Sequence, residues 1–331
     1  MGLGLLALFF YRANFGEIGS ALAQARYIYL LPAVPVYFVA VVFRTLRWHY
    51  LLHPLKEVPS RRLFPVVVIG YMANNLLPVR LGDVVRSYLV GEKEGMSKAA
   101  ALTTTIVERL FDGLALVLLL LILLPLVPLK GVSAEWSSSG LVLALIAVGA
   151  AIVALLAAVF VVTLSPRLAG TLGNLGLRFL PRRLHERARD LGTRFYSGLD
   201  ALRMPGPLLA VFTLSFLVWL AEFAMYYLVA LAFPIGRPYT EIAFGGSAAN
   251  LAISIPSLPG GVGPFEVAFL GSLTNVGVDR DLASAYIVVL HAALLVPVTV
   301  LGLAYLWREN ISWGRLTQSL QGKASLKEGR Q

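Results

Sequence analysis

Long apolar stretches separated by short polar segments dominate the pattern of the 331-residue chain. A bilayer core about 30 Å thick needs roughly 20 apolar residues per helix. Five stretches are long enough for such a span: 27–52, 97–128, 141–164, 208–233 and 281–307. The opening stretch, 1–11, is apolar but too short, so it is either the end of a first helix that begins upstream or a partly embedded helix. We expect no cleaved signal peptide, because the faint processing site at 21–25 lacks a charged leader.

Two further apolar stretches, 63–77 and 241–256, are shorter. Each runs into a cluster of proline and glycine and then into a second short helical segment, 83–90 or 264–276. A short helix, a break and another short helix are typical of a re-entrant hairpin. A kinked full span is the alternative interpretation. The residues expected to form the two breaks are Pro78, Gly82, Pro259, Gly260, Gly261 and Gly263.

The composition indicates a helical membrane protein. Apolar residues make up 58% of the chain and charged residues 14%, whereas soluble proteins have about 45–50% and about 25%. The mean hydropathy is +0.77. These values argue against a soluble multidomain enzyme and exclude intrinsic disorder. We therefore predict an all-α, polytopic integral membrane protein. The chain has no cysteine, which excludes disulfides, thiolate catalysis and cysteine-ligated metals.

The distribution of basic residues predicts the orientation. Most of the 28 lysine and arginine residues lie in four segments: 43–62, 80–98, 165–207 and the tail from residue 307. Cytoplasmic loops carry such an excess, so we predict a multi-pass protein of the cell inner (cytoplasmic) membrane with its C-terminus in the cytoplasm. The net charge of +10 is explained in this way, and we expect no nucleic-acid partner because the basic residues are not on a soluble domain.

The two predicted hairpins resemble one another. Each contains Pro-x-x-x-Gly followed by a carboxylate, Asp83 or Glu266, and each precedes a long helix with a candidate N-cap, Ser97 or Asp279. The charge distribution puts the hairpins on opposite faces of the membrane. This arrangement predicts an inverted-topology repeat, as in many secondary transporters. We expect a single transmembrane domain over 1–331, with repeat one at about 27–128, repeat two at about 208–307 and a basic cytoplasmic loop at 165–207.

Ionisable residues within the apolar stretches are the strongest candidates for function, because each costs at least about 2.5–3.5 kcal/mol to insert. The stretch 97–128 contains Glu108, Arg109 and Asp112. Glu108 and Asp112 are four residues apart, share one helix face and need a cation, for which Arg80 and Arg86 are candidates. One interpretation is a buried ion-pair network that holds the hairpin against the helix. The other is a polar cavity for an anionic head group.

The first break carries groups suited to phosphate. Arg80 and Arg86 flank Gly82-Asp83, and a guanidinium binds phosphate oxygens in a bidentate manner. The alternative is that these arginines are ordinary basic residues at the cytoplasmic rim. Asn74 and Asn75 lie at the tip, where side-chain amides satisfy backbone groups freed by the break.

The second repeat carries fewer ionisable residues. Glu266 begins a helix, where it either caps the N-terminus or contacts the substrate. His291 lies mid-span and is either a hydrogen-bonded packing residue or a proton relay, and Glu222 is a protonated acid or an ion-pair partner. The full set of predicted substrate-binding residues is Asn74, Asn75, Arg80, Asp83, Arg86, Glu108, Arg109, Asp112, Glu222, Glu266 and His291.

The sequence gives little support for catalysis. Nucleophile-elbow and metalloprotease motifs are absent, and the glycine-rich 259–264 lacks the Lys-Ser/Thr of a phosphate-binding loop. His49 and His53 have a spacing that can bind metal, but an interfacial aromatic belt explains them better. We expect no catalytic residue, no metal and no cofactor.

The loop 165–207 contains an arginine-rich run, 178–194, with interleaved leucines. This pattern predicts an amphipathic helix on an anionic membrane surface. A helix that docks a partner protein is the alternative.

Three motifs resemble those of a known family. They are the runs 74–86 (NNLLPVRLGDVVR), 107–113 (VERLFDG) and 259–266 (PGGVGPFE). Together they resemble the flippase-like membrane family that forms the transmembrane region of lysylphosphatidylglycerol synthases, whose members occur alone or fused to aminoacyl-transfer or glycosyltransferase domains. The resemblance implies a flippase for aminoacyl-phospholipid or another lipid. Asp83 stands where glutamate is expected, and residues after 307 leave no room for an aminoacyl-transferase domain, so we expect no lysyl transfer by this chain.

We therefore expect a lipid translocator that moves a phosphate-headed amphiphile, of the aminoacyl-phospholipid, phospholipid or polyprenyl-phosphate type, across the membrane. Arg80, Arg86 and Arg109 would neutralise the phosphate, while Glu108, Asp112 and Glu266 balance these charges or take a cation. The main alternative is a membrane anchor or assembly module for a lipid-modifying or glycosyltransferase enzyme, and a homo-oligomer is a further possible assembly. An intramembrane enzyme is the third class.

Overall fold

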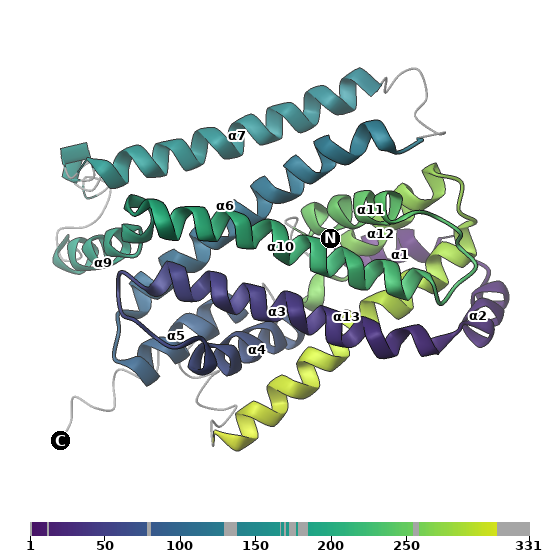
Figure 1. Ribbon diagram of the computed structural model, residues 1–331, viewed down its shortest axis with the longest axis horizontal. Coiled ribbons are helices and arrows are strands. Elements are labelled where there is room, and N and C mark those ends of the chain that lie inside the picture. Colours follow the sequence, from purple (N-terminus) through teal and green to yellow (C-terminus); the bar gives the residue numbers. More distant parts are fainter. Residues whose placement is uncertain are drawn as a thin grey trace.

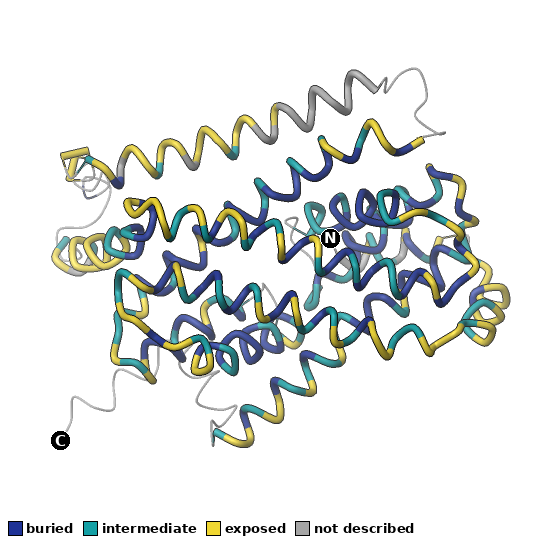
Figure 2. Tube along the Cα trace, in the orientation of Figure 1, coloured by how far each residue is buried: buried dark blue, intermediate teal, exposed yellow. Residues whose placement is uncertain are grey.

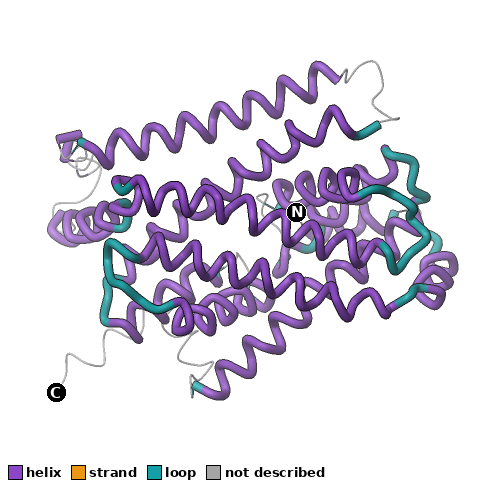
Figure 3. The backbone as a smooth tube through the Cα atoms, viewed as in Figure 1, coloured by secondary structure: helices purple, strands orange, loops and turns teal. Residues whose placement is uncertain are grey.

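The computed structural model describes residues 2–11, 13–77, 81–128, 138–165, 167–168, 170–171, 177, 185–253 and 258–309. Over these residues the regular secondary structure is helical and contains no strand, which confirms the all-α prediction (Figure 1, Figure 3).

The helices follow the apolar stretches closely. In chain order they are α1 (Gly2–Phe10), α2 (Phe15–Gln24), α3 (Leu30–Leu52), α4 (Ser60–Leu76), α5 (Gly82–Glu94), α6 (Lys98–Leu123), α7 (Ser138–Leu164), α9 (His185–Ser197), α10 (Pro205–Ala230), α11 (Tyr239–Ala252), α12 (Pro264–Asn275) and α13 (Arg280–Arg308). Short 3₁₀ turns are η1 (Tyr27–Tyr29), η3 (Leu124–Leu126), η6 (Asp200–Arg203) and η7 (Pro259–Gly261).

Four helical segments of the described chain are long and apolar enough to cross a membrane: Tyr27–Leu52, Lys98–Leu126, Pro205–Ala230 and Arg280–Arg308. They correspond to four of the five predicted spans, so the chain is a membrane protein with several spanning helices. The fifth predicted span, 141–164, lies within α7 and stays a prediction.

Two pairs of shorter helices form antiparallel hairpins. At the open end of the α4–α5 hairpin, Glu94 contacts Lys56 and Arg62, which lie before and at the start of α4. At the open end of the α11–α12 hairpin, Arg237 donates a hydrogen bond of 3.0 Å to the carbonyl of Gly277. The predicted helices on either side of each break are therefore present.

Local signals set the starts of the long helices that follow the hairpins. Gly95 ends α5 in the left-handed region, with φ 65°, and the Ser97 side chain then accepts a hydrogen bond from the Ala100 N–H. The Asp279 side chain accepts hydrogen bonds from the N–H groups of Asp281 and Leu282. Both predicted N-caps are confirmed.

The two hairpins open toward opposite ends of the bundle. The open end of α4–α5 lies beside the end of α13, where Lys93 is paired with Glu309. The open end of α11–α12 lies beside the start of α13, which follows Gly277. Between these ends α4 contacts η7, and the Asn75 side chain donates a hydrogen bond of 3.0 Å to the Thr299 hydroxyl of α13.

The centre of the bundle is the interface of α3 with α10, and the hairpins pack around it. More than half of the positions of α4, α6 and α11 are buried, whereas α2 and α9 are largely exposed (Figure 2). α7 lies at the edge of the bundle beside α6 (Figure 1). This arrangement brings polar residues of α3, α5, α6 and α10 into the interior.

Two segments outside the predicted spans, the N-terminal stretch 1–11 and the loop 165–207, also contain helices among the described residues. α1 is short, as the sequence indicated, and packs on α12, with Phe9 buried. In the loop 165–207 the structure describes α9, whose Leu191 and Phe195 are exposed, as expected for an amphipathic helix. Leu180 and Leu184, also assigned to that helix, lie outside the described residues.

Candidate functional site

Six charged side chains from three helices, α3, α5 and α6, form one connected group in the interior. We call it the arginine–carboxylate cluster, and it consists of Arg47, Asp83, Arg86, Glu108, Arg109 and Asp112. The three positive and three negative charges balance. Charges at membrane depth are tolerated when they pair in this way, and they mark candidate functional sites.

Arg47 of α3 lies at the centre of the cluster and is fully buried. Its Nη1 donates to Asp112 Oδ1 at 2.6 Å and to the Ser215 hydroxyl at 2.9 Å. Its Nη2 donates to Glu108 Oε1 at 2.7 Å and to Asp112 Oδ2 at 3.1 Å. Both carboxylates of the shared face of α6 thus meet one guanidinium, which ties α3, α6 and α10 together.

Arg86 of α5 joins the hairpin to the cluster. Its Nη2 donates to Glu108 Oε2 at 2.7 Å and lies 3.4 Å from Asp83 Oδ1. The guanidinium also lies over the Trp48 ring, 4.9 Å from the ring centroid. Its Nε and Nη1 atoms are buried and have no hydrogen-bond partner. Arg86 therefore keeps donors for a further acceptor while its charge is neutralised.

Arg109 is the most accessible cation of the cluster. It binds Asp83 in a bidentate manner, with Nε to Oδ2 at 3.0 Å and Nη2 to Oδ1 at 2.9 Å. The Arg109 side chain is 32% exposed and that of Asp83 is 22% exposed, whereas Arg47 and Glu108 are fully enclosed. Arg109 lies eleven residues after Lys98, or about 16 Å along α6, which is near the middle of a bilayer core.

A second buried pair joins α3 to α10. Arg44 is paired with Glu222, and the Tyr226 hydroxyl donates to Glu222 Oε1 at 3.0 Å. The Arg44 guanidinium also lies 5.2 Å from the Tyr71 ring centroid and 5.5 Å from that of Trp219. Glu222 is thus an ion-pair partner, one of the two roles that the sequence left open.

Arg44 and Arg47 correct the sequence analysis, which counted both among the basic residues of the cytoplasmic segment 43–62. They are 6% and 0% exposed and lie inside a candidate span. The physical reason is that α3 continues to Leu52, so these residues face α6 and α10 rather than water. Two features of the sequence could have indicated their burial. Arg44 and Arg47 are three residues apart, on one face at the end of an apolar stretch, and other spans contain acids that have no partner nearby in the sequence.

The first break is held by a side-chain amide and a close backbone approach. The Gly82 N–H donates to Asn74 Oδ1 at 2.8 Å, which is the role the sequence assigned to the tip asparagines. A Cβ on Gly82 would lie 1.9 Å from the Gly70 carbonyl oxygen, so only glycine fits there. Asn75 instead bonds to α13. Pro78 and Arg80 lie outside the described residues.

The second break contains a carboxylate–histidine pair. Glu266 accepts a hydrogen bond of 2.7 Å from the Gly263 N–H, so its capping role is confirmed, and its other oxygen meets His291 Nδ1. His291 Nε2 lies 3.1 Å from the Gly260 carbonyl oxygen. Gly260, Gly261 and Gly263 have positive φ values, which lets the backbone turn sharply here.

The predicted site residues therefore fall into separate groups. Within the described ranges, no hydrogen bond or ion pair joins the Glu266–His291 pair to the arginine–carboxylate cluster. Asp83, Arg86, Glu108, Arg109 and Asp112 do come together, as one connected network.

One exposed group of carboxylates is close enough to hold a metal ion in the described part of the chain. Oxygens of Glu17, Asp279 and Asp281 lie within 4.8 Å of one another. Each already has a local role: Asp279 caps α13, while Glu17 and Asp281 accept hydrogen bonds from Asn14. Helix capping therefore explains this group.

Comparison with known proteins settles the family. The model of the lysylphosphatidylglycerol synthase TM region matches residues 1–302. The chain belongs to this family. A UPF0104 membrane protein of Methanothermobacter thermautotrophicus is similar to this member, with 28% identity over 87% of this chain and 88% of the relative. A second such protein from the same organism is 28% identical over 86% and 85% of the two chains.

One relative of this lysylphosphatidylglycerol synthase TM-region member is larger. The glycosyltransferase AglD of Haloferax volcanii is 26% identical over 86% of this chain, which corresponds to 49% of AglD. No solved structure matches.

Proposed function

We propose that this protein is a lipid translocator that carries the phosphate-bearing head group of an amphiphile across the cytoplasmic membrane while the acyl or prenyl tails stay in the bilayer. The observation that carries the proposal is the buried arginine–carboxylate cluster, in which two nitrogens of Arg86, Nε and Nη1, have no hydrogen-bond partner and lie next to a helix break. The membership of the lysylphosphatidylglycerol synthase TM-region family supports it.

The lengths of the hairpin helices support re-entrant segments. α4 has 17 residues, α5 has 13, α11 has 14 and α12 has 12. At 1.5 Å per residue they reach about 18–26 Å, less than a bilayer core of about 30 Å. We infer that each hairpin enters the membrane, breaks inside it and returns to the same face. Broken backbone at membrane depth needs protein or water around it, and the described glycines Gly82 and Gly261, at the two breaks, are buried.

The contacts of the hairpins support an inverted repeat. Asp83, at the start of α5, pairs with Arg109 of α6, 26 residues later. Glu266, at the start of α12, pairs with His291 of α13, 25 residues later. In both repeats, therefore, a carboxylate at the start of the second hairpin helix pairs with a basic residue of the long helix that follows, at nearly the same separation in sequence. The two hairpins open toward opposite ends of the bundle. Alternating access at a midplane site, as in many secondary transporters with inverted repeats, fits this arrangement.

The cluster has a surplus of donors over acceptors. Each guanidinium carries five N–H groups and each carboxylate two oxygens. Besides Arg86, the Tyr71 hydroxyl and Arg47 Nε are buried without a partner. A phosphate can therefore bind Arg86 and Arg109 by replacing carboxylate oxygens one at a time, so that no guanidinium is left without a counter-ion. Because the three arginines are already balanced by three carboxylates, the interior stays neutral only if a proton or another cation enters with the phosphate and neutralises a displaced carboxylate.

A second function is favoured by a specific observation. Every charge of the cluster has an ion-pair partner, as expected for a membrane module that only anchors or assembles a separate enzyme. The relative AglD is named a glycosyltransferase, and this chain matches about half of it. In this alternative the cluster stabilises the bundle and moves no lipid.

Reconstituted vesicles containing a head-group-labelled phosphatidylglycerol distinguish the two. We expect Arg86→Met to abolish translocation, because it removes the free donors while Glu108 keeps Arg47 as its partner. The matched control is the double variant Arg44→Met/Glu222→Gln, which neutralises the neighbouring buried pair and should retain translocation. No translocation by the folded wild-type protein would leave the anchoring function, and equal, measurable rates in wild type and Arg86→Met would refute the role assigned to Arg86.

A further inference from the structure

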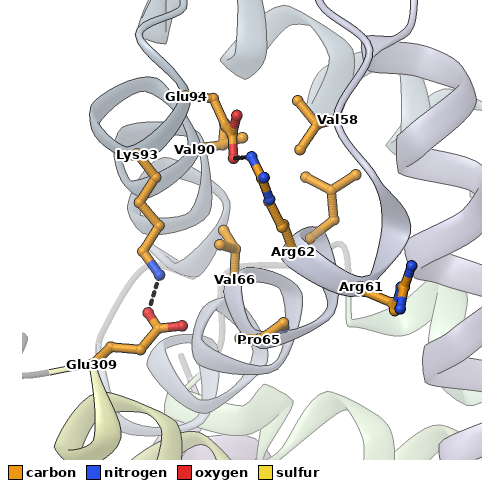
Figure 4. Close-up of a pocket in the computed structure, with 10 residues that line it drawn as sticks. Val58, Arg61, Arg62, Pro65, Val66, Val90, Lys93, Glu94 and Glu309 are labelled. Carbon is orange, nitrogen blue, oxygen red and sulfur yellow. Dashed lines mark hydrogen bonds and ion pairs between the residues drawn. The ribbon is translucent and has the colours of Figure 1, made fainter.

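A basic pocket lies at the open end of the α4–α5 hairpin, at the face that we propose to be cytoplasmic. It has a volume of about 270 Å³ and is bounded by the start of α4, the end of α5 and Glu309, which follows α13. Arg61, Arg62 and Lys93 line it together with the carboxylates of Glu94 and Glu309 (Figure 4). None of these residues belongs to the arginine–carboxylate cluster.

Positive charge is in excess around the basic pocket. Lys93 is paired with Glu309, and Arg62 lies 3.6 Å from Glu94. Glu94 is shared with Lys56, at 3.5 Å, so one carboxylate serves two cations. In Figure 4 no dashed line reaches Arg61, and no contact with a carboxylate is present for it among the described residues.

The ion pairs of the pocket are weak enough to exchange. The Arg62 side chain is 69% exposed, and those of Lys93 and Glu309 are 33% and 24% exposed. Exposed pairs contribute little stability, about 0–1 kcal/mol each. A doubly or singly charged phosphate competes well with a carboxylate for arginine and lysine. Binding of a phosphate would release Glu309 from Lys93 and loosen the contact between α5 and α13.

The pocket and the cluster both include residues of α5. The apolar residues that line the pocket include Val66 of α4 and Val90 of α5. Val90 lies one helical turn from Arg86 on the same face of α5, and Lys93 lies seven residues from Arg86, about 10 Å along the helix. A head group held by Lys93 is therefore separated from the unpartnered donors of Arg86 by about two turns of α5 and a thin apolar layer.

We propose that the basic pocket is a loading site, which binds the phosphate of an anionic lipid head group before it moves inward to the cluster. The proposal rests on the proposed function, because it supplies the first step of that path. The ligand chemistry is a phosphate ester, with the lipid tails lying in the adjacent bilayer. Soluble phosphate shares this chemistry and is an outcome of the test.

The test uses two variants that break the same ion pair in opposite directions. Lys93→Gln removes a phosphate ligand, whereas Glu309→Gln removes a competitor of phosphate. We expect Lys93→Gln to weaken equilibrium binding of fluorescent phosphatidylglycerol to the protein in mixed micelles by about fivefold, and Glu309→Gln to strengthen it by a similar factor. A merely structural ion pair predicts changes of the same sign, or none, in both variants, and this result would overturn the proposal.

Two further measurements complete the design. Arg61→Gln, which breaks no contact with a carboxylate, should weaken binding, whereas Arg26→Gln, at an exposed position outside the pocket, should leave binding unchanged; equal effects of both would contradict a specific pocket. If millimolar inorganic phosphate displaces the labelled lipid, the ligand of the pocket is soluble phosphate, and the proposal that it is a lipid head group is overturned. Binding is measured without transport, so the two proposals can fail separately. If the wild-type protein translocates lipid but the pocket variants bind it as well as wild type does, only the loading site is refuted. If the wild-type protein does not translocate lipid, the proposed function is refuted.

Discussion

The Arg44–Glu222 pair offers a quantitative test of how the interior is stabilised. Its side chains are 7% and 6% exposed, and the Tyr226 hydroxyl donates to the carboxylate. Removing one partner leaves an uncompensated buried charge, which costs about 3–5 kcal/mol. Removing both charges leaves two neutral side chains. We therefore expect Arg44→Met and Glu222→Gln each to destabilise the protein by about 3 kcal/mol or more, and the double variant to be far less destabilised than their sum.

The assay is reversible unfolding by sodium dodecyl sulfate in mixed micelles, followed by circular dichroism. A double-mutant cycle gives the interaction free energy of the pair, provided that each single variant removes only this contact. Glu222→Gln suits the cycle because glutamine keeps an acceptor for Tyr226. An interaction free energy near zero, with the two single effects adding up in the double variant, would refute the reasoning that the charges stabilise each other.

Three further predictions concern the hairpins and the helix starts. Gly82→Ala should destabilise the protein by about 2 kcal/mol or more in the same unfolding assay, because the new Cβ would lie 1.9 Å from the Gly70 carbonyl oxygen. Asp279→Ala should cost about 1 kcal/mol through loss of the N-cap of α13. Because the chain has no cysteine, single cysteines at Arg61 and Arg237 should react with a membrane-impermeant maleimide from opposite sides of oriented vesicles.

Each of these predictions has its own check. Gly113→Ala is the control for Gly82→Ala, since its Cβ would meet only Ile152 Cδ1, at 3.4 Å, and it should leave stability nearly unchanged. A stable Gly82→Ala variant would show that the backbone approach is not a constraint. For Asp279→Ala, unfolding at the wild-type detergent fraction would show that the cap contributes nothing. Labelling of both cysteines from one side would contradict hairpins of opposite orientation.

The helices were predictable from sequence because their signals are local. The length of an apolar stretch, a proline–glycine break and a capping residue such as Ser97 or Asp279 each act within a few residues. The hairpin helices and four of the spans therefore lie close to their predicted ranges. The tip role of Asn74 followed from the same local logic, since a break frees backbone groups that a neighbouring amide can satisfy.

The partners of the buried charges were only partly predictable. Arg86, one of the two arginines that the sequence offered as a cation for Glu108, does pair with it, and the two residues are only 22 positions apart in the chain. Arg47 and Arg44 were missed, because their partners Glu108 and Glu222 are 61 and 178 residues away and the charge rule assigned both arginines to water. Which helix passes beside which is set by the packing of the whole bundle, and the hydrophobic pattern of a single chain does not determine it.

The measurement that tests the translocator most directly is the reduction of a fluorescent phosphatidylglycerol by external dithionite in vesicles that contain the purified protein. Dithionite does not cross the bilayer, so only label in the outer leaflet is reduced in protein-free vesicles. We expect label from the inner leaflet to be reduced as well when the wild-type protein is present, and not when Arg86→Met replaces it. Reduction that stops at the outer leaflet with folded wild-type protein would contradict lipid translocation.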